Sequence, residues 1–253
     1  MFAEERRNAI VEMINKQKKA TVQELCDKYT ASPGTIRTDL QVLEDNGLLK
    51  RTHGGAISIN RSSFEQTTVE KDILHFDEKK SVARAAVNLI DDGDTIVIDT
   101  GTTLMELAKL LYQKKNLTVV TNDLKIAMEL DKFDSITVNM IGGTVRHNYQ
   151  CTYGPQAIED LSNIYVDKTF LATNGFSIEA GITTPDISTA EIKKQFIKIA
   201  GETHLLCDSS KFGRICFKKI ADISDLKSVI TDRKANPEQI RQIQDQGVHV
   251  ITE

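Results

Sequence analysis

The chain has 253 residues, of which 40% are hydrophobic and 27% are charged, and its formal net charge at pH 7 is −4. This length exceeds the usual size of a single domain, so two domains are expected. Residues 1–60 hold nine Lys and Arg against eight Asp and Glu, whereas the remainder holds 23 against 28. The overall charge therefore disfavours binding of a polyanion, and any DNA affinity must come from local basic residues and from several copies binding together.

Other classes of protein are disfavoured by what the sequence lacks. No apolar run reaches the ~18 residues that span a bilayer, and the first ten residues lack the order of a secretory signal, so we expect a cytoplasmic protein without membrane contact. The histidines show no metal-ligand spacing, and neither a metal site nor a cofactor is predicted. The cysteines form no C-x-x-C pair and are expected to be reduced and structural: Cys26, Cys151, Cys207 and Cys216.

The N-terminal sequence predicts three helices. Apolar residues at helical spacing around Ile10 predict a helix over residues 3–17. Thr21 lies three residues before Glu24, which is the spacing of a capping box and predicts the start of a second helix. Ser32 can cap a third helix, because the proline that follows it tolerates the first helical position. Two short helices separated by a tight turn indicate a helix-turn-helix.

The third helix has one apolar face and one polar face. Ile36, Leu40 and Leu43 fall at i, i+4 and i+7 and are expected to face the core. The helix should end near Asn46-Gly47, a C-cap pair, and a hairpin or wing should follow. The side chains expected to meet DNA are Thr35, Arg37, Thr38 and Gln41 on the helix, and Lys50, Arg51 and His53 on the wing. A helical hairpin used only for protein association is the alternative, and it would show no salt-dependent DNA binding.

The segment TIRTDLQVLEDNGLLKRTHGGA resembles the N-terminal signature of the DeoR family of bacterial transcriptional regulators. The family pattern usually has two adjacent arginines where this chain has Arg37-Thr38, so one positive contact is absent and the operator preference is expected to shift. The resemblance implies double-stranded operator DNA as a partner. Because function on a two-fold operator favours an even number of chains, we expect a homodimer or a homotetramer.

The rest of the chain predicts a second domain of the α/β class. Residues 58–72 are polar and short of periodic apolar positions, which is typical of a linker between a DNA-binding domain of residues 1–57 and a domain of residues 73–253. Strands alternating with helices predict a mostly parallel sheet with helices on both faces. Strands are expected at 95–99, 118–121, 136–141, 168–172, 203–207, 228–231 and 248–251, and helices at 79–90, 103–112, 124–130, 156–162, 188–200 and 237–245.

Four strand ends carry distinctive sequences, and ligands of such sheets bind beyond the carboxyl ends of the strands. They are DTGTT at 99–103, TND at 121–123, IGGTVR at 141–146 and DSSK at 208–211. The first leads a glycine and hydroxyl groups into a helix N-terminus, whose free amides favour phosphate. The first three are also compatible with ordinary loops or helix caps, whereas a solvated turn would rarely combine the side chains of the fourth.

The motifs DTGTT, TND, IGG, TTP and DSSKFG resemble the effector-sensing half of the DeoR family, which is similar in fold to ribose-5-phosphate isomerase. The resemblance implies a sugar-phosphate effector, with DTGTT matching the isomerase phosphate loop and DSSK its D-E-S-K segment. Lys211 is then the expected phosphate anchor, with Arg146 and Lys193 as second choices. The other expected effector-binding residues are Asp99, Thr100, Gly101, Thr102, Thr103, Thr121, Asn122, Gly142, Gly143, Asn174, Gly175 and Glu191.

Departures from the isomerase pattern argue against catalysis. An aldose–ketose isomerase needs a carboxylate base and charged groups that stabilise the enediolate. Two aspartates of the isomerase pattern are replaced here by Asn174 and Ser177, its lysine is absent, and Glu191 alone is kept. The sequence therefore favours a DNA-binding regulator, a repressor of a carbohydrate operon that responds to a phosphorylated sugar. The alternative is an isomerase-like enzyme with an appended DNA-binding domain.

Overall fold

A computed structural model describes residues 2–45, 48–58, 62–63 and 65–253. The contacts divide the chain into two compact units, Met1–Gln66 and Thr67–Glu253. Among the described residues, no helix is long and apolar enough to cross a membrane. All four cysteines are free thiols in buried positions.

The described residues of the first unit form three helices and a three-stranded antiparallel sheet in the order β1-β3-β2. Its core joins side chains of all three helices, among them Ile10, Leu25 and Leu40. The predicted capping box is present, since the backbone N–H of Thr21 donates to Glu24 Oε2 at 2.7 Å. The elements are α1 (Ala3–Gln17), β1 (Lys19–Thr21), α2 (Val22–Tyr29), α3 (Pro33–Asp45), β2 (Leu49–Thr52) and β3 (Gly55–Ser58). The C-cap predicted at Asn46-Gly47 lies outside the described residues.

The sequence did not predict two features of this unit, namely strand β1 and the ion pairs of Asp39. Strand β1 lies against the wing so closely that a Cβ at Gly55 would come within 2.0 Å of the Ala20 carbonyl oxygen, which explains the glycine. Asp39, 1% exposed, lies on the inner face of α3 and accepts hydrogen bonds from Arg6 at 2.6 Å and Arg7 at 2.8 Å. This carboxylate therefore ties α1 to α3.

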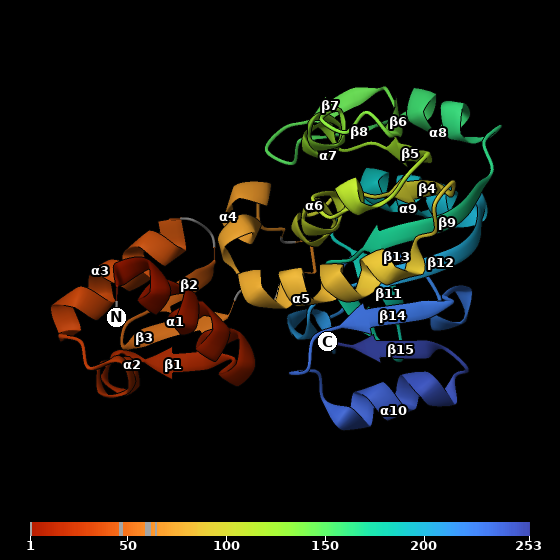
Figure 1. Ribbon diagram of the computed structural model, residues 1–253. Coiled ribbons are helices and arrows are strands. Elements are labelled where there is room, and N and C mark those ends of the chain that lie inside the picture. The colour runs from red at the N-terminus through yellow and green to blue at the C-terminus, as the bar shows by residue number, and fades with distance from the viewer. Residues whose placement is uncertain (1, 46–47, 59–61, 64) are drawn as a thin grey trace. The chain divides into compact units, whose positions relative to one another are not determined.

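The second unit is built on a parallel sheet in the order β15-β14-β12-β9-β4-β5-β6 (Figure 1). The mostly parallel sheet expected from the sequence is confirmed. Its strands are β4 (Thr95–Ile98), β5 (Leu117–Thr121), β6 (Ile136–Met140), β9 (Val166–Ala172), β12 (Ala200–Leu206), β14 (Ser228–Thr231) and β15 (His249–Thr252). The helices are α4 (Thr68–Ile73), α5 (Phe76–Ala86), α6 (Thr102–Ala108), α7 (Leu124–Leu130), α8 (Pro155–Leu161), α9 (Ile187–Lys198) and α10 (Pro237–Asp245), and short 3-10 turns span Val87–Leu89, Leu111–Gln113, Ser209–Lys211 and Ile223–Asp225.

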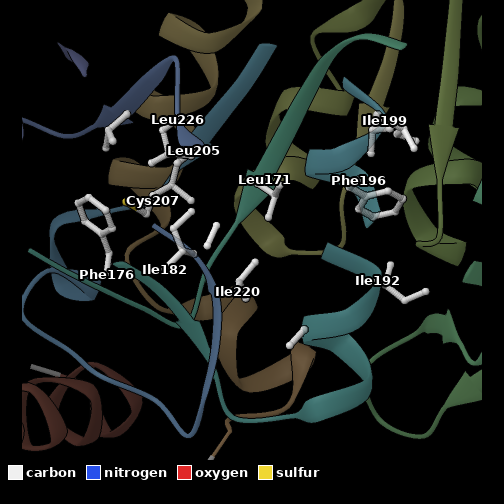
Figure 2. Packing of buried hydrophobic residues seen from close by; sticks show 14 of the residues in the cluster. Leu171, Phe176, Ile182, Ile192, Phe196, Ile199, Leu205, Cys207, Ile220 and Leu226 are labelled. Carbon is white, nitrogen blue, oxygen red and sulfur yellow. The ribbon is translucent and has the colours of Figure 1, made fainter. Parts of the chain in front are cut away.

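Two hydrophobic clusters show that helices cover both faces of this sheet. One cluster joins α5, α6 and α7 to strand residues such as Ile96 and Val119. The other joins α8, α9 and α10 to the opposite side chains of the same strands, such as Val97 and Val120. Figure 2 shows part of the second cluster, with Leu171 of β9 and Phe196 of α9 among its members. Successive side chains of β4 and β5 point to opposite faces of the sheet, so neighbouring residues pack in different hydrophobic clusters.

The second unit also contains short antiparallel strands that the sequence did not predict. Strands β7 (Thr144–Arg146) and β8 (Cys151–Tyr153) pair as a hairpin, and β10 (Gly175–Ser177), β11 (Gly181–Thr184) and β13 (Lys218–Ala221) form a separate sheet. Strands of three or four residues are too short to show a period of two, and the partner of β11 in β13 comes from far along the chain. The local pattern therefore could not reveal them.

The segment expected to be a linker, residues 58–72, contains more structure than its polar composition predicts. Ser58 completes β3, and α4 begins at Thr68. The hydroxyl oxygen of Thr67 accepts from the Glu70 N–H at 3.4 Å, while Glu70 Oε2 accepts from the Thr67 N–H at 2.6 Å. This capping box repeats the Thr-x-x-Glu spacing that predicted α2, so the sequence carried a signal for α4 that polarity obscured.

Candidate functional site

Helix α3 presents the polar face predicted from its sequence. Arg37, Thr38 and Gln41 are exposed, and Thr35 is half-buried beside the helix start. Ser32 acts as a cap, because its Oγ accepts from the Thr35 N–H at 3.1 Å. The Thr38 hydroxyl donates back to the Gly34 carbonyl oxygen at 3.1 Å, and the Arg37 side chain is exposed on the same face.

The wing is attached to the end of α3 by specific hydrogen bonds. The Arg51 N–H donates to Glu44 Oε1 at 2.8 Å, and the Arg51 guanidinium donates to Gln41 Oε1. Lys50 and His53 are exposed on β2 and at the hairpin tip. The residues of the helix and the wing that are predicted to contact DNA thus lie on neighbouring elements, and a hydrogen bond joins Arg51 to Gln41.

A cavity of about 270 Å³ opens in the second unit at the start of α6. Gly101 and Thr102 of the DTGTT segment, which is expected from the sequence to bind an effector, line it. Gly101 is the N-cap of α6 and has φ of 149°, a conformation that favours glycine. The other lining residues come from α4, α5, α6 and the TND segment with α7, and they are Thr68, Asp72, Phe76, Lys79, Met105, Glu106, Lys109, Asp123 and Lys125.

Lys79 is a cavity residue that sequence reasoning missed. It is 4% exposed, and its Nζ donates to the Lys71 carbonyl oxygen. Burial, the largest cause, and the nearby charge of Lys211 together lower the pKa of the Lys79 ammonium to about 8, against the opposing effect of Asp208 and Asp72. A buried cation without a direct carboxylate bond is costly, so such a group favours an anionic ligand. The sequence around Lys79 did not indicate that this lysine would be buried, because it lies near the start of a helix.

The other charged side chains of the cavity wall are paired. Lys125 lies 3.6 Å from Asp72, and Lys109 lies 2.5 Å from Glu106 on its own helix. Asp123 is 5% exposed, and burial raises its pKa although Thr100 and two backbone N–H groups of α7 donate to it. The cavity therefore combines cations and carboxylates.

The DTGTT and TND segments are joined by one hydrogen bond. The Thr100 hydroxyl donates to Asp123 Oδ2 at 2.7 Å, so this hydroxyl offers a ligand its lone pairs. Thr103 and Thr121 are buried, and Thr121 accepts from the Asp123 N–H at 3.1 Å. Asn122 donates to the Thr152 carbonyl oxygen at 2.9 Å. The Thr100–Asp123 hydrogen bond thus joins the two strand ends, while Asn122 ties the TND segment to β8.

Asp99 and Lys193 form a buried ion pair. Asp99 is 0% exposed and Lys193 3% exposed, and Lys193 Nζ also donates to the Ala172 carbonyl oxygen at 3.0 Å. Asp99 Oδ2 accepts from the Ala172 N–H at 3.0 Å, while its Oδ1 is buried without a hydrogen-bond partner among the described residues. Lys193 was expected to contact a phosphate as a second choice, but here its charge is matched by Asp99.

The predicted residues of the third motif are not among those that line the cavity. Arg146 lies 3.5 Å from Asp186 and stacks over the Tyr149 ring at 3.8 Å. A Cβ at Gly143 would come within 2.5 Å of the Tyr153 carbonyl oxygen, whereas Gly142 is exposed with open space around it. Gly143 is therefore explained by the close approach of its own hairpin.

Lys211 belongs to a cluster next to Lys79. Its Nζ lies 3.7 Å from Asp208 Oδ2 and 3.2 Å from the Ser210 hydroxyl. Asp208 is 1% exposed. Burial opposes ionisation of Asp208, but Lys211, His75 and hydrogen bonds from Ser210 outweigh it and lower the pKa to about 2. The expected anchor is thus paired with a carboxylate, and the residues that line the cavity include Lys79 but not Lys211.

The residues that match the isomerase segments do not form an acid–base pair. Glu191 is exposed and lies 3.1 Å from Lys194 and 3.6 Å from Lys218, and the Lys194 hydrogen bond lowers its pKa. Asn174 Oδ1 accepts from the Thr184 hydroxyl at 2.9 Å. A Cβ at Gly175 would come within 2.5 Å of the Arg214 carbonyl oxygen, which explains that glycine by packing.

A winged helix-turn-helix followed by a parallel α/β unit with a ligand-sized cavity defines a DNA-binding transcriptional regulator with a sensor domain. The DeoR-like helix-turn-helix domain matches residues 6–62, and the DeoR C terminal sensor domain matches residues 74–233. The chain therefore belongs to the DeoR family of transcriptional regulators, as its motifs predicted.

Similar proteins span nearly the whole chain. The uncharacterized HTH-type transcriptional regulator YulB of Bacillus subtilis is 36% identical over 250 residues, covering 99% of this chain and 96% of YulB. The HTH-type transcriptional regulator GlpR of Haloferax volcanii is 34% identical, covering 99% and 98%. The HTH-type transcriptional repressor GlcR of Bacillus subtilis is 33% identical, covering 93% and 91%.

Solved structures resemble the fold of about half of the chain. Ribose 5-phosphate isomerase A from Methanocaldococcus jannaschii gives a TM-score of 0.41 at 18% identity, covering 55% of each chain. A ribose-5-phosphate isomerase in complex with phospho-erythronic acid gives 0.40 at 17% identity, covering 53% of this chain and 52% of the isomerase.

Proposed function

We propose that this chain represses a carbohydrate-metabolism operon and releases its operator when a phosphorylated sugar binds in the cavity at the start of α6. The observation that carries the proposal is the cavity itself, where the buried Lys79 ammonium faces the same space as Gly101 and Thr102. A phosphate there would gain a charge-assisted hydrogen bond, and backbone N–H groups at the helix start would add to it. A volume of about 270 Å³ suits a small ligand.

Repression is supported by the names of relatives. One relative is a transcriptional repressor, GlcR, and another, 32% identical over 249 residues, is a putative aga operon transcriptional repressor of Escherichia coli O157:H7. The DNA-binding face of the proposal consists of the α3 and wing residues, with Arg37 as its central cation. Because residues 1–60 carry little net charge, firm binding would require an even number of chains on a two-fold operator.

The geometry favours sensing over isomerisation. A proton transfer between adjacent carbons needs a carboxylate within hydrogen-bond reach of the substrate. Glu191 is exposed and paired with two lysines, and Lys193 is matched by the buried Asp99. The second candidate function is an isomerase-like enzyme, and the observation that supports it is the resemblance of the motifs to those of the isomerase.

One experiment separates the two functions. The full chain is incubated with glucose 6-phosphate, fructose 1-phosphate, ribose 5-phosphate and the corresponding free sugars, and both thermal stability and product formation are followed. A bound effector at 100 times its Kd should stabilise the folded state by about 2.7 kcal/mol. We expect stabilisation by one phosphorylated sugar without turnover. Turnover would support the enzyme, and equal effects of free and phosphorylated sugars would contradict a phosphate site.

A further inference from the structure

Helix α4 is the first element after the DNA-binding unit, and it also forms part of the cavity wall. The first unit ends at Gln66, and α4 begins two residues later. Thr68 and Asp72 of α4 line the cavity, and Phe76 and Lys79 of α5 extend the same wall. A ligand in this cavity therefore meets the segment that continues directly into the DNA-binding unit.

Two of the cavity lysines hold α4 in place. Lys125 on α7 lies 3.6 Å from the Asp72 carboxylate, and the Lys79 ammonium donates to the Lys71 carbonyl oxygen near the end of α4. Both lysines line the cavity. The groups that would bind an anion are thus the groups that bind α4.

Further contacts attach α4 to the loop after β7, and one of them places Lys71 Nζ 5.6 Å from the centroid of the Tyr149 ring. The start of α4 is joined to the same loop, where the Thr68 N–H donates to the Asn148 carbonyl oxygen at 3.3 Å and the Thr68 hydroxyl donates to the Tyr149 carbonyl oxygen at 3.2 Å. None of its six residues is buried, and Val69 and Ile73 are 66% and 52% exposed. A short helix without a buried apolar face opens at small cost.

An anion in the cavity would oppose these attachments. A phosphate dianion is a stronger acceptor for an ammonium group than a backbone carbonyl or a half-exposed carboxylate. Asp72 also lines the cavity, and its negative charge would be repelled by a dianion a few ångströms away. Binding therefore draws Lys79 and Lys125 towards the ligand. It weakens the ion pair with Asp72 and the hydrogen bond to the Lys71 carbonyl oxygen, which also accepts from the Leu74 N–H at 3.3 Å.

We infer that α4 is a latch that an anionic ligand releases by competing for Lys79 and Lys125. The inference rests on the proposed function, because it requires an anion in this cavity. Helix α4 follows the DNA-binding unit directly in the chain. When a ligand releases α4, this unit is therefore held less firmly by the cavity wall. The same competition lowers ligand affinity, because part of the binding free energy is used to open the latch.

Hydrogen exchange of the full chain tests the latch, with inorganic phosphate as the probe and chloride at equal ionic strength as the reference. Two segments are read separately. Protection of residues 101–104 reports anion binding, and loss of protection in residues 67–75 reports release of α4. With phosphate we expect about ten-fold faster exchange in 67–75, the effect of losing the half-exposed Lys125–Asp72 ion pair and the hydrogen bond from the Lys79 ammonium. Protected residues 101–104 with unchanged or slower exchange in 67–75 would overturn the latch and leave the proposed function standing.

Two variants test the latch without any ligand. Asp72→Asn and Lys125→Ala each remove the same ion pair from opposite sides, and both should speed exchange in residues 67–75 without phosphate. Lys132→Ala is the matched control. Lys132 is an exposed lysine just after α7, the helix that carries Lys125, and it pairs with Glu129 at 2.5 Å. Asp72→Asn should also bind phosphate more tightly than the unmodified chain. Wild-type exchange in both variants would overturn the latch, whereas absence of phosphate protection at 101–104 in every protein would contradict the proposed function.

Discussion

The lowered pKa of Lys79 makes ligand binding dependent on pH. The Lys79 ammonium has a pKa of about 8, so it is mostly charged at pH 7 and mostly neutral at pH 9. A sugar phosphate remains dianionic over this range, because its second pKa is near 6. We therefore expect the Kd of the effector to be constant below pH 8 and to rise by up to ten-fold per pH unit above it. Calorimetric titration from pH 7 to 9.5 measures this dependence.

Lys79→Arg is the control for that titration. The guanidinium stays charged throughout this range, so the rise in Kd should disappear even if overall affinity falls. An identical pH profile in Lys79→Arg would show that another group causes the dependence. Lys79→Ala should weaken effector binding at pH 7 by about one to two orders of magnitude, the loss of one charge-assisted hydrogen bond.

Arg37 is the residue on which the DNA face depends most. Arg37→Ala should cost about 1–3 kcal/mol of operator binding and relax discrimination at one base pair if the guanidinium contacts a guanine. Gel-shift titrations with single-base variants of a duplex selected from a random pool measure both effects. Arg241→Ala removes an exposed arginine of the second unit and serves as the control. A uniform loss across all sequences would instead indicate a phosphate contact, and unchanged affinity would remove Arg37 from the interface.

At the scale of elements, Asp39 joins α1 to α3 through two arginines. Asp39→Asn leaves Arg6 and Arg7 without their buried carboxylate, and we expect it to lower the free energy of unfolding of the first unit by about 2–3 kcal/mol. Urea denaturation followed by circular dichroism gives this value. Asp45→Asn, at an exposed position of the same helix, should change the free energy of unfolding little. Equal stability of Asp39→Asn and the unmodified chain would show that the ion pairs contribute no net stability.

The elements that the sequence predicted are those with a repeated pattern. Helices α1, α2 and α3 follow from apolar spacing, Thr21 and Pro33, and the central strands follow from apolar runs between helices. Strands β7, β8, β10, β11 and β13 have three or four residues and pair through tertiary contacts, so no local period marks them. Helix α4 was hidden by its polarity, although Thr67 and Glu70 carry a capping-box signal.

The candidate site was predictable in part for the same reason. The glycine and hydroxyl groups at 101–102 stand at a strand end, and the structure places them at a cavity. Lys79 and Lys125 could not be identified, because their role depends on how α4 and α7 meet in space. The predicted lysines at 193 and 211 were recognised as charges. Asp208 lies three residues before Lys211 in the same motif, whereas Asp99 is far from Lys193 along the chain and comes into contact with it only in the folded chain.

At the scale of the whole molecule, the cavity and the DNA face belong to different units of one chain. The two sites are coupled by an equilibrium between two forms of the protein that differ in their affinity for DNA and for the effector. The effector shifts this equilibrium only to the extent that it binds one form more tightly than the other. By reciprocity, operator DNA should weaken effector binding by the factor by which the effector weakens operator binding. The residues that carry this coupling in our account are those of α4.

The most direct measurement is fluorescence anisotropy of the selected duplex bound to the full chain while the stabilising sugar phosphate is added. The account predicts release over the concentration range in which the ligand fills the cavity, no release by the free sugar, and a release curve for Lys79→Ala displaced to about 10–100-fold higher concentration. A duplex that stays bound when the cavity is saturated, or an undisplaced curve for Lys79→Ala, would contradict control of DNA binding by this cavity.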